Sequence, residues 1–510
     1  MGDSTIAVMN NCVPTFGNGS DVKSVSWQQV RMKRSLSAAV AGAPSKRSRS
    51  TQKDIFLPSR NDNNMLLLRY SLPLHGANIG TICALSQFLK PASSLPAAMR
   101  LVAKVMDSQL DLPDVQYSGL RVLIELGPRN LGTRRYVKLF MQAMRVHFTN
   151  PMIQYEACRG LLHWMKVEEQ VMKEIGATEN LFLLMKSLEY HSFSLQLRYM
   201  ILDIVRGIIG SSKEWLQRVA TQKDVVASVM RLLKKCISDA YTQQIGLSIL
   251  SWVIEEKPSR DIVIKEGGVE HLLHAMTVHP LDDAVQCNAA ATLCWLIHTS
   301  GSSEGSLLSP SGLEIVLTTM KRFLYNPMVF GNSVCALSGA MVYHSREEGL
   351  NLPSRELAEL TLLGMKIHRV SPKVHRNGLT LLRFLIINGD ESEVGALILK
   401  NIDVLKTSMN THVDDTAIQA EACGILAHLS SRSGEACVVI KKSGCVEAVV
   451  LCQAKHHGHL RVQHNALWFH SCLLRNHEMS PAEVAFGGGL QVLVTMTTGL
   501  VNPVANHQIQ

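Results

Sequence analysis

Two short stretches of this 510-residue chain carry residue types that could do chemistry. The first, Gly301-Ser302-Ser303-Glu304-Gly305, spells the hydrolase elbow, in which the serine between the glycines is a nucleophile. That chemistry requires a strand before the serine and a helix after it. Here a predicted helix ends before the motif, and a loop rich in Ser, Pro and Gly follows. We interpret the match as accidental.

The second stretch combines Cys452 with His456, His457 and His459, which are four soft metal ligands. Structural zinc sites usually take two ligand pairs of short spacing, and a second pair is missing here. We interpret the stretch as a polar turn and expect neither a metal nor a cofactor. The chain also lacks a phosphate-binding loop, a zinc-protease helix motif and a kinase signature. We therefore expect that it is not an enzyme.

Basic residues near the start have the spacing of a bipartite nuclear localisation signal. Lys33 and Arg34 form the first cluster, and Lys46, Arg47 and Arg49 form the second. This signal would bind a nuclear import receptor and place the protein in the nucleus, the cytoplasm or both. The alternative is a solvated basic tail. Two serines follow an arginine by three residues and are candidate phosphorylation sites that would add negative charge beside the clusters: Ser37 and Ser50.

The overall composition favours helices, because 46% of the residues are hydrophobic and only 5% are aromatic. No uncharged apolar run approaches the length of a membrane span, so we expect no membrane partner. Residues 1–60 carry nine Lys or Arg against three Asp, and the remaining residues are close to neutral. We therefore do not expect a nucleic-acid partner. The start does not resemble a secretory signal, so we predict twelve reduced cysteines.

The element that must position any site is a repeat. Nine times, at intervals of 38 to 47 residues, an aliphatic residue and usually Gln precede a small residue and an apolar helical run. Four places after the small residue, an aliphatic residue recurs on the same helix face. The Gln position is occupied by Gln116, Gln154, Gln196, Gln243, Gln286, Phe330, His375, Gln419 and Gln463.

One copy departs from this pattern. After Leu195 and Gln196, Tyr199 stands at the small position, and the next interval is the longest, so we expect a distorted repeat there. In a regular unit, a short helix ends at the glycine pair Gly267 and Gly268, a second helix follows, and a third starts near Ala284. The small residue is expected where two helices cross closely.

The chain is thus predicted to contain four segments. Residues 1–62 form a disordered basic arm, and residues 63–114 form an irregular helical cap. Residues 115–500 form the repeat solenoid, and residues 501–510 form a flexible tail.

Three helices per unit, a glycine between the first two and a Gln–x–x–Ala start to the third resemble the armadillo repeat. The resemblance implies an all-α fold, a right-handed α-solenoid of about nine armadillo-type three-helix repeats. It also implies a protein-binding scaffold or adaptor whose third helices line a concave groove. Nuclear-import adaptors of this family carry an Asn ladder late in the third helix. None of the corresponding positions here, nine residues after the Gln position, is Asn.

Five of those late positions are aromatic instead, and aromatic side chains are favoured binding anchors. We predict that they bind a peptide or helix of a partner protein, although the same side chains could belong to the core. Two other functions remain open: a nuclear transport adaptor and the substrate-recognition subunit of a ubiquitin ligase complex. The candidate groove residues are His163, Trp252, Trp295, Phe384 and His428.

Overall fold

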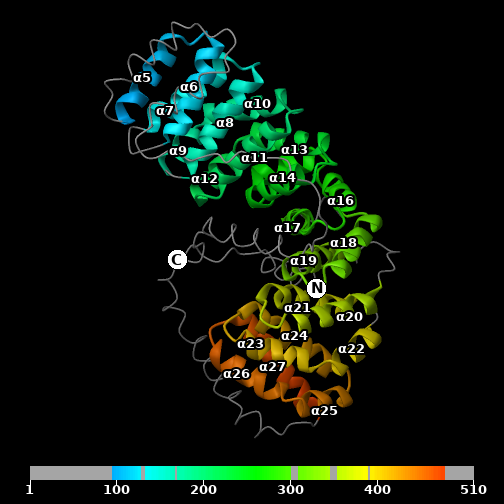
Figure 1. Ribbon diagram of the computed structural model, residues 1–510. Coiled ribbons are helices and arrows are strands. Elements are labelled where there is room, and N and C mark those ends of the chain that lie inside the picture. The colour runs from blue at the N-terminus through cyan, green and yellow to red at the C-terminus, as the bar shows by residue number, and fades with distance from the viewer. Residues whose placement is uncertain are drawn as a thin grey trace, which may run out of the picture. The chain divides into compact units, whose positions relative to one another are not determined.

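The computed structural model describes residues 95–127, 133–166, 169–299, 308–344, 353–388 and 391–476. Every regular element in these ranges is an α-helix, which confirms the all-α prediction (Figure 1). None of these helices is both long and apolar enough to cross a membrane. The described helices form two compact units that divide between Trp164 and Met165.

The smaller unit contains two pairs of helices, and each pair consists of the second and the third helix of a repeat. In both pairs a proline begins the third helix, where its missing N–H leaves no bond unmade. α5 packs on both α6 and α7. The helices are α5 (Leu95–Ser108), α6 (Pro113–Leu126), α7 (Thr133–Val146) and α8 (Pro151–Met165).

The larger unit begins with three complete three-helix repeats. Each has a short first helix, a longer second helix and a long third helix, as the sequence predicts. The first repeat is α9 (Glu169–Ile175), α10 (Thr178–Tyr190) and α11 (Leu195–Ile209). The next two are α12 (Lys213–Ala220), α13 (Lys223–Lys235), α14 (Ala240–Val253), α15 (Lys257–Lys265), α16 (Gly268–Val278) and α17 (Asp283–Thr299).

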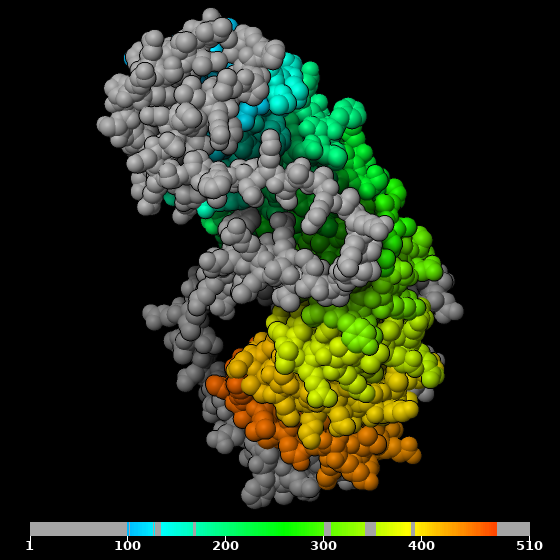
Figure 2. Space-filling view, viewed as in Figure 1, coloured from blue at the N-terminus to red at the C-terminus, as the bar shows by residue number. Residues whose placement is uncertain are grey.

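The rest of the larger unit continues the same order. Each third helix packs on the third helix of the next repeat, from α11 through α14, α17, α19, α21 and α24 to α27 (Figure 1). In Figure 2 the surface of the larger unit passes from green to orange in chain order. The total number of repeats stays a prediction. The remaining helices are α18 (Pro310–Arg322), α19 (Pro327–His344), α20 (Ser354–Ile367), α21 (Pro372–Asn388), α22 (Glu391–Lys400), α23 (Asp403–Thr411), α24 (Thr416–Arg432), α25 (Gly434–Lys442), α26 (Cys445–Lys455) and α27 (Leu460–Arg475).

The recurring Gln joins the second helix of a repeat to the third. In α17, the Nε2 of Gln286 donates to the carbonyl of Met276 at 2.7 Å and to that of His279 at 3.0 Å. These carbonyls lie at the end of α16, where a helix leaves its last acceptors unsatisfied. We call this pair of bonds the glutamine bridge, and we call the equivalent position of every third helix the bridge position, whichever residue occupies it. The same two bonds, reaching ten and seven residues back, are made by Gln116, Gln154, Gln243, Gln419 and Gln463.

The small residue after the bridge position lies where the second and third helices cross, as predicted. A Cβ added to Gly246 would lie 2.5 Å from the Leu233 side chain, and one added to Gly119 would lie 2.5 Å from that of Met106. Leu233 and Met106 are also the residues whose carbonyls accept the bridge. The aliphatic residues four places later are fully buried or nearly so, for example Leu123, Leu161, Leu250 and Leu426.

The expectation of a distorted repeat at Leu195 and Gln196 is wrong. Both residues are exposed, and the bridge position of α11 belongs to Arg198, two residues later. Arg198 lies 44 residues after Gln154 and 45 before Gln243, so the spacing is regular. Its guanidinium donates to the Ser192 carbonyl at 2.8 Å and to the Asp239 carboxylate at 2.5 Å. The arginine conceals the register in the sequence, because one bond to the turn after α10 and an ion pair with Asp239 stand in place of the two glutamine bonds.

Two more bridge positions hold a residue other than Gln, and in each case a residue of the next repeat accommodates the different side chain. Phe330 is buried against α20 of the next repeat, where a Cβ on Gly364 would lie 2.1 Å from its ring. His375 is completely buried, and its Nδ1 lies 2.8 Å from the Ser408 hydroxyl. Burial, and secondarily the nearby His412, lowers the pKa of His375 to about 4.

Two sets of hydrogen bonds, which we call the histidine ladder and the asparagine ladder, join successive repeats. The residue that ends a second helix is often a histidine, and its Nε2 donates to a backbone carbonyl of the preceding repeat. In this way His279 binds Ile237, His368 binds Leu324 and His456 binds Val413. Two residues after the bridge position, an asparagine Nδ2 donates to the preceding third helix. These bonds run from Asn288 to Gln244, Asn332 to Cys287, Asn377 to Gly331 and Asn465 to Ala420.

The prediction that all twelve cysteines are reduced is wrong for one pair. Cys294 on α17 and Cys335 on α19 form a disulfide between neighbouring third helices, with their Cα atoms 5.7 Å apart. The eight other cysteines in the described ranges are free. Spacing along the chain could not show this pair, because 41 residues separate its members.

We predict that replacing Gln286 with Met, which keeps the size but removes the amide, lowers the free energy of unfolding by about 3 kcal/mol. The reason is that two buried carbonyls would lose their donor. Urea denaturation followed by circular dichroism measures the change. Gln217→Met, at an exposed position of α12, is the matched control and should leave stability unchanged. Equal stability of both variants would contradict the role of the bridge.

We predict that acid lowers the stability of the folded chain in part through His375. The folded pKa of about 4 lies below the ordinary value of 6.5, so above pH 6.5 the histidine is neutral in both states. As the pH falls from 6.5 towards 4, the unfolded chain gains a proton that the folded chain does not, and stability falls. At pH 5 this loss amounts to about 2 kcal/mol.

His375→Gln removes this titrating group and restores the usual bridge residue. Ser408 would then donate to the glutamine Oε1, as Thr319 donates to Gln286 at 2.8 Å. We expect the variant to lose less stability than the native chain between pH 7 and pH 5, as measured by urea denaturation. His274→Gln, on the surface of α16, serves as the control. Parallel pH profiles of the native chain and His375→Gln would count against this account.

Candidate protein-binding face

The part of the third helices that the ladders leave accessible is the candidate site. It consists of the residues one, five and nine places after each bridge position, which we call the third-helix face. Most of these residues are half-buried, whereas their helical neighbours are buried. The asparagine ladder lies directly beside the face and holds adjacent third helices together.

The five predicted aromatic residues all lie nine places after a bridge position, but their exposure differs. His163 on α8 is exposed, and it belongs to the smaller unit. Trp252, Phe384 and His428, on α14, α21 and α24, are half-buried. Trp295 on α17 is only 5% exposed and therefore contributes to the core. The structure thus places three of the five on the accessible part of the third-helix face in the larger unit.

Trp468 is a residue of this face that the sequence reasoning missed. It lies on α27, five places after Gln463, and is half-buried. Its ring packs edge-on against His428 of α24, with the ring centroids 4.6 Å apart. Burial, and secondarily the charge of Arg383, lowers the pKa of His428 to about 4, so the imidazole is neutral at pH 7. A search of the position five places after the bridge would have found Trp468.

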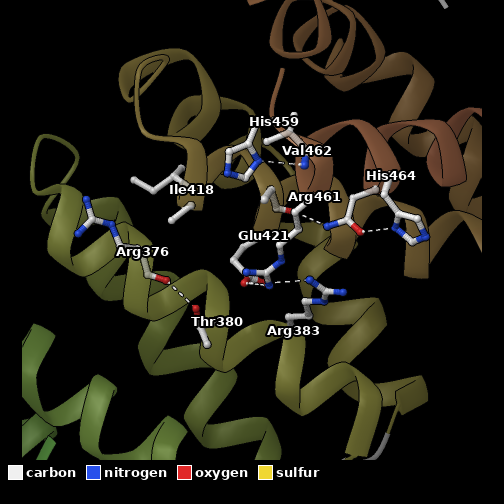
Figure 3. A network of polar contacts seen from close by, with 12 residues as sticks. Arg376, Thr380, Arg383, Ile418, Glu421, His459, Arg461, Val462 and His464 are labelled. Atoms are coloured by element: carbon white, nitrogen blue, oxygen red, sulfur yellow. Dashed lines mark hydrogen bonds and ion pairs between the residues drawn. The ribbon is translucent and has the colours of Figure 1, made fainter. Parts of the chain in front are cut away.

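A buried carboxylate organises the polar part of the face between α21, α24 and α27 (Figure 3). Glu421, only 2% exposed, accepts from Arg383 at 3.2 Å and, through its other oxygen, from Arg461. The two guanidiniums approach the carboxylate from the helices on either side of α24 (Figure 3). Buried charges are tolerated when they are paired in this way.

Glu421 occupies the position that holds asparagine in the ladder, two places after Gln419. An asparagine there would bond to the α21 backbone, whereas the glutamate exchanges that bond for two ion pairs. Gly424, one turn later, leaves room for the exchange, because a Cβ there would lie 2.9 Å from the Arg383 guanidinium. Among the last five third helices, α17 to α27, this position holds Asn in every helix except α24, so the sequence itself shows the exception at Glu421.

The remaining sequence candidates do not belong to this face. His456 of the histidine-rich turn belongs to the histidine ladder, and Cys452 is buried in α26. The predicted nuclear localisation signal, with Lys33, Arg34, Lys46, Arg47 and Arg49, lies outside the described residues. The candidate phosphorylation sites Ser37 and Ser50 also lie outside them.

Replacing Glu421 should reveal how much this network contributes. We predict that Glu421→Ala lowers the free energy of unfolding by about 3 to 5 kcal/mol, because it leaves two partly buried guanidiniums without their carboxylate. Glu421→Asn should cost less, since asparagine can rejoin the ladder. Urea denaturation measures both variants, with Glu435→Ala at an exposed position as the control. The interpretation fails if Glu421→Ala is no more harmful than Glu435→Ala.

Comparison with known proteins agrees with this architecture. The family model described as LRRK2 ARM repeat matches residues 99–304. A crystal structure of an engineered protein from the Northeast Structural Genomics Consortium superposes with a TM-score of 0.51 at 17% identity, covering 82% of this chain and 99% of that one. A second structure comes from work on a phosphorylation switch that controls the interaction between cadherin and beta-catenin. It superposes with a TM-score of 0.50 at 14% identity, covering 81% and 91% of the two chains.

Both structural matches are below 25% sequence identity, so they show a similarity of fold and nothing more. The fold they share with this chain is the one that the sequence signature predicts, with three-helix units and stacked third helices. Together with the match of the ARM-repeat family model to residues 99–304, they show that the chain has the fold of an armadillo-repeat solenoid.

Proposed function

We propose that the chain is a non-enzymatic scaffold or adaptor that binds a segment of a partner protein along its third-helix face. Armadillo solenoids generally serve as protein-interaction scaffolds, and the matched beta-catenin structure comes from work on such an interaction. The fold alone does not indicate which surface binds the partner. The choice rests on the side chains that the third helices carry.

The observation that carries the proposal is the run of aromatic side chains on α21, α24 and α27. Phe384, His428 and Trp468 stand on three consecutive third helices, and each is half-buried. A half-buried aromatic ring already has a fixed orientation, so it can bury further area on binding at a low cost in entropy. Arg383 precedes Phe384 on α21, and its side chain is 16% exposed. Among the described residues its guanidinium bonds to Glu421 through one N–H, so other N–H groups can bind a backbone carbonyl or carboxylate of the partner.

The same side chains favour an extended or helical peptide over a small molecule. They are spread over three consecutive third helices, α21, α24 and α27. A peptide can contact each helix in turn, in the way that a repeated surface is used in solenoid proteins. We place this function in the nucleus, the cytoplasm or both, with a nuclear import receptor as a second partner for the basic arm.

The test compares partner capture by the native chain and by Phe384→Ala/His428→Ala/Trp468→Ala. Affinity purification followed by mass spectrometry identifies partners of the full-length chain, and the affinity of each is then measured by calorimetry. We expect at least one partner whose binding weakens about 100-fold in the triple variant, because each aromatic anchor contributes 1 kcal/mol or more. Circular dichroism verifies that the variant is folded.

The matched control removes aromatic side chains elsewhere on the surface. Phe193 and Tyr325, in the turns before α11 and α19, are 87% and 79% exposed. Phe193→Ala/Tyr325→Ala should retain every partner. If the folded triple variant also retains every partner at native affinity, the third-helix face is not the binding surface.

A further inference from the structure

One cluster of metal-ligating side chains lies apart from the aromatic run. Cys294 and His298 stand one turn apart on α17, and Cys335 faces them from α19. The two sulfurs and an imidazole nitrogen all lie within 4.8 Å of one another. Within the described parts of the chain, this is the only group of three or more Cys, His, Asp or Glu with such geometry.

The imidazole is held in place beside the sulfurs. The Nε2 of His298 lies 3.4 Å from the Cys335 Sγ and 3.3 Å from the Cys335 carbonyl oxygen. Its Nδ1 is buried and has no hydrogen-bond partner among the described residues. A disulfide by itself needs no third ligand, so the disulfide does not explain this placement.

Gly339 makes room for the imidazole. A Cβ at this position would lie 3.0 Å from both the Cε1 and the Nε2 of His298. Gly339 stands nine places after the bridge position Phe330, where neighbouring third helices carry Trp295 and Phe384. The missing side chain therefore coincides with the place where His298 approaches the pair Cys294 and Cys335.

We propose that Cys294, His298 and Cys335 bind a thiophilic metal ion of the zinc class when both cysteines are reduced. Thiolate sulfur and imidazole nitrogen are the ligands that such ions prefer. Two thiolates neutralise a divalent cation, which suits a site whose cysteines are each only 1% exposed. The three side chains leave a fourth coordination position that a non-protein ligand such as water would fill.

Reduction and binding are two balanced steps. A dithiol or phosphine reductant supplies two electrons, the Cys294–Cys335 bond breaks, and the two sulfurs take up two protons. The divalent ion then replaces both thiol protons, which are released to solvent, and the imidazole donates a lone pair. The metal-bound and disulfide states exclude each other because they use the same sulfurs.

The experiment titrates the full-length chain with Co²⁺, after reduction with a phosphine and without oxygen. Cobalt(II) reports thiolate coordination through a charge-transfer absorption band in the near ultraviolet. We expect this band to saturate at one equivalent of Co²⁺ and to disappear when Zn²⁺ is added. Cys294→Ser and Cys335→Ser should abolish it. His298→Ala should weaken binding by at least about tenfold, because even groups beyond the ligands contribute that much to metal sites.

The chain contains its own control pair. The sulfurs of Cys423 and Cys452 lie 4.0 Å apart and are buried, but no histidine forms a metal-ligating group with them. Cys423→Ser should therefore leave the band unchanged. Circular dichroism confirms folding, and His298→Gln provides a second variant should His298→Ala unfold.

Three outcomes would overturn the proposal. One is a reduced chain that shows no charge-transfer band, and another is a band that persists in Cys294→Ser. The third is a disulfide that the phosphine cannot reduce in the folded chain, because the pair would then be a permanent covalent link. These outcomes leave the proposed partner binding untouched, since it rests on Phe384, His428 and Trp468.

Discussion

The glutamine bridge is the interaction on which the rest of this structure depends. A helix that ends inside a protein leaves carbonyl groups that must find donors. In most repeats, one amide on the third helix provides for two carbonyls of the second helix at once. Because both bonds come from one rigid group, they fix where the two helices cross. The close contact at the following small residue, and the direction of the third helix, follow from that crossing.

The bridge also shows that a repeat is not specified by its own residues alone. Arg198 can replace Gln because the next repeat contributes Asp239. Phe330 fits because α20 carries Gly364, and His375 fits because α23 offers the Ser408 hydroxyl. In each case the compensating residue lies one repeat further along the chain. The packing of each repeat therefore depends in part on residues of the next repeat.

This arrangement explains what the sequence could and could not predict. The period, the three-helix unit, the buried leucines and the crossing at Gly246 follow from local patterns, and all could be predicted. The register at Arg198 could not, because the side chain that replaces Gln has a different chemical type. The contact between Trp468 and His428 and the network around Glu421 depend on pairs of residues about 40 positions apart, which no single-helix pattern contains. The Cys294–Cys335 disulfide is hidden for the same reason.

The ladders between repeats bear on how a chain of this kind can gain or exchange repeats in evolution. Each asparagine and each histidine donates to a backbone carbonyl of the preceding repeat, and every residue has such a carbonyl. The ladder bonds by themselves therefore require no matching side chain in the preceding repeat, unlike the contacts of Arg198, Phe330 and His375. The junction at Glu421 is different, because it requires an arginine on both sides. A repeat added to such an array could therefore form its ladder bonds with any neighbour, whereas α21, α24 and α27 would have to be inherited together to keep the ion pairs of Glu421.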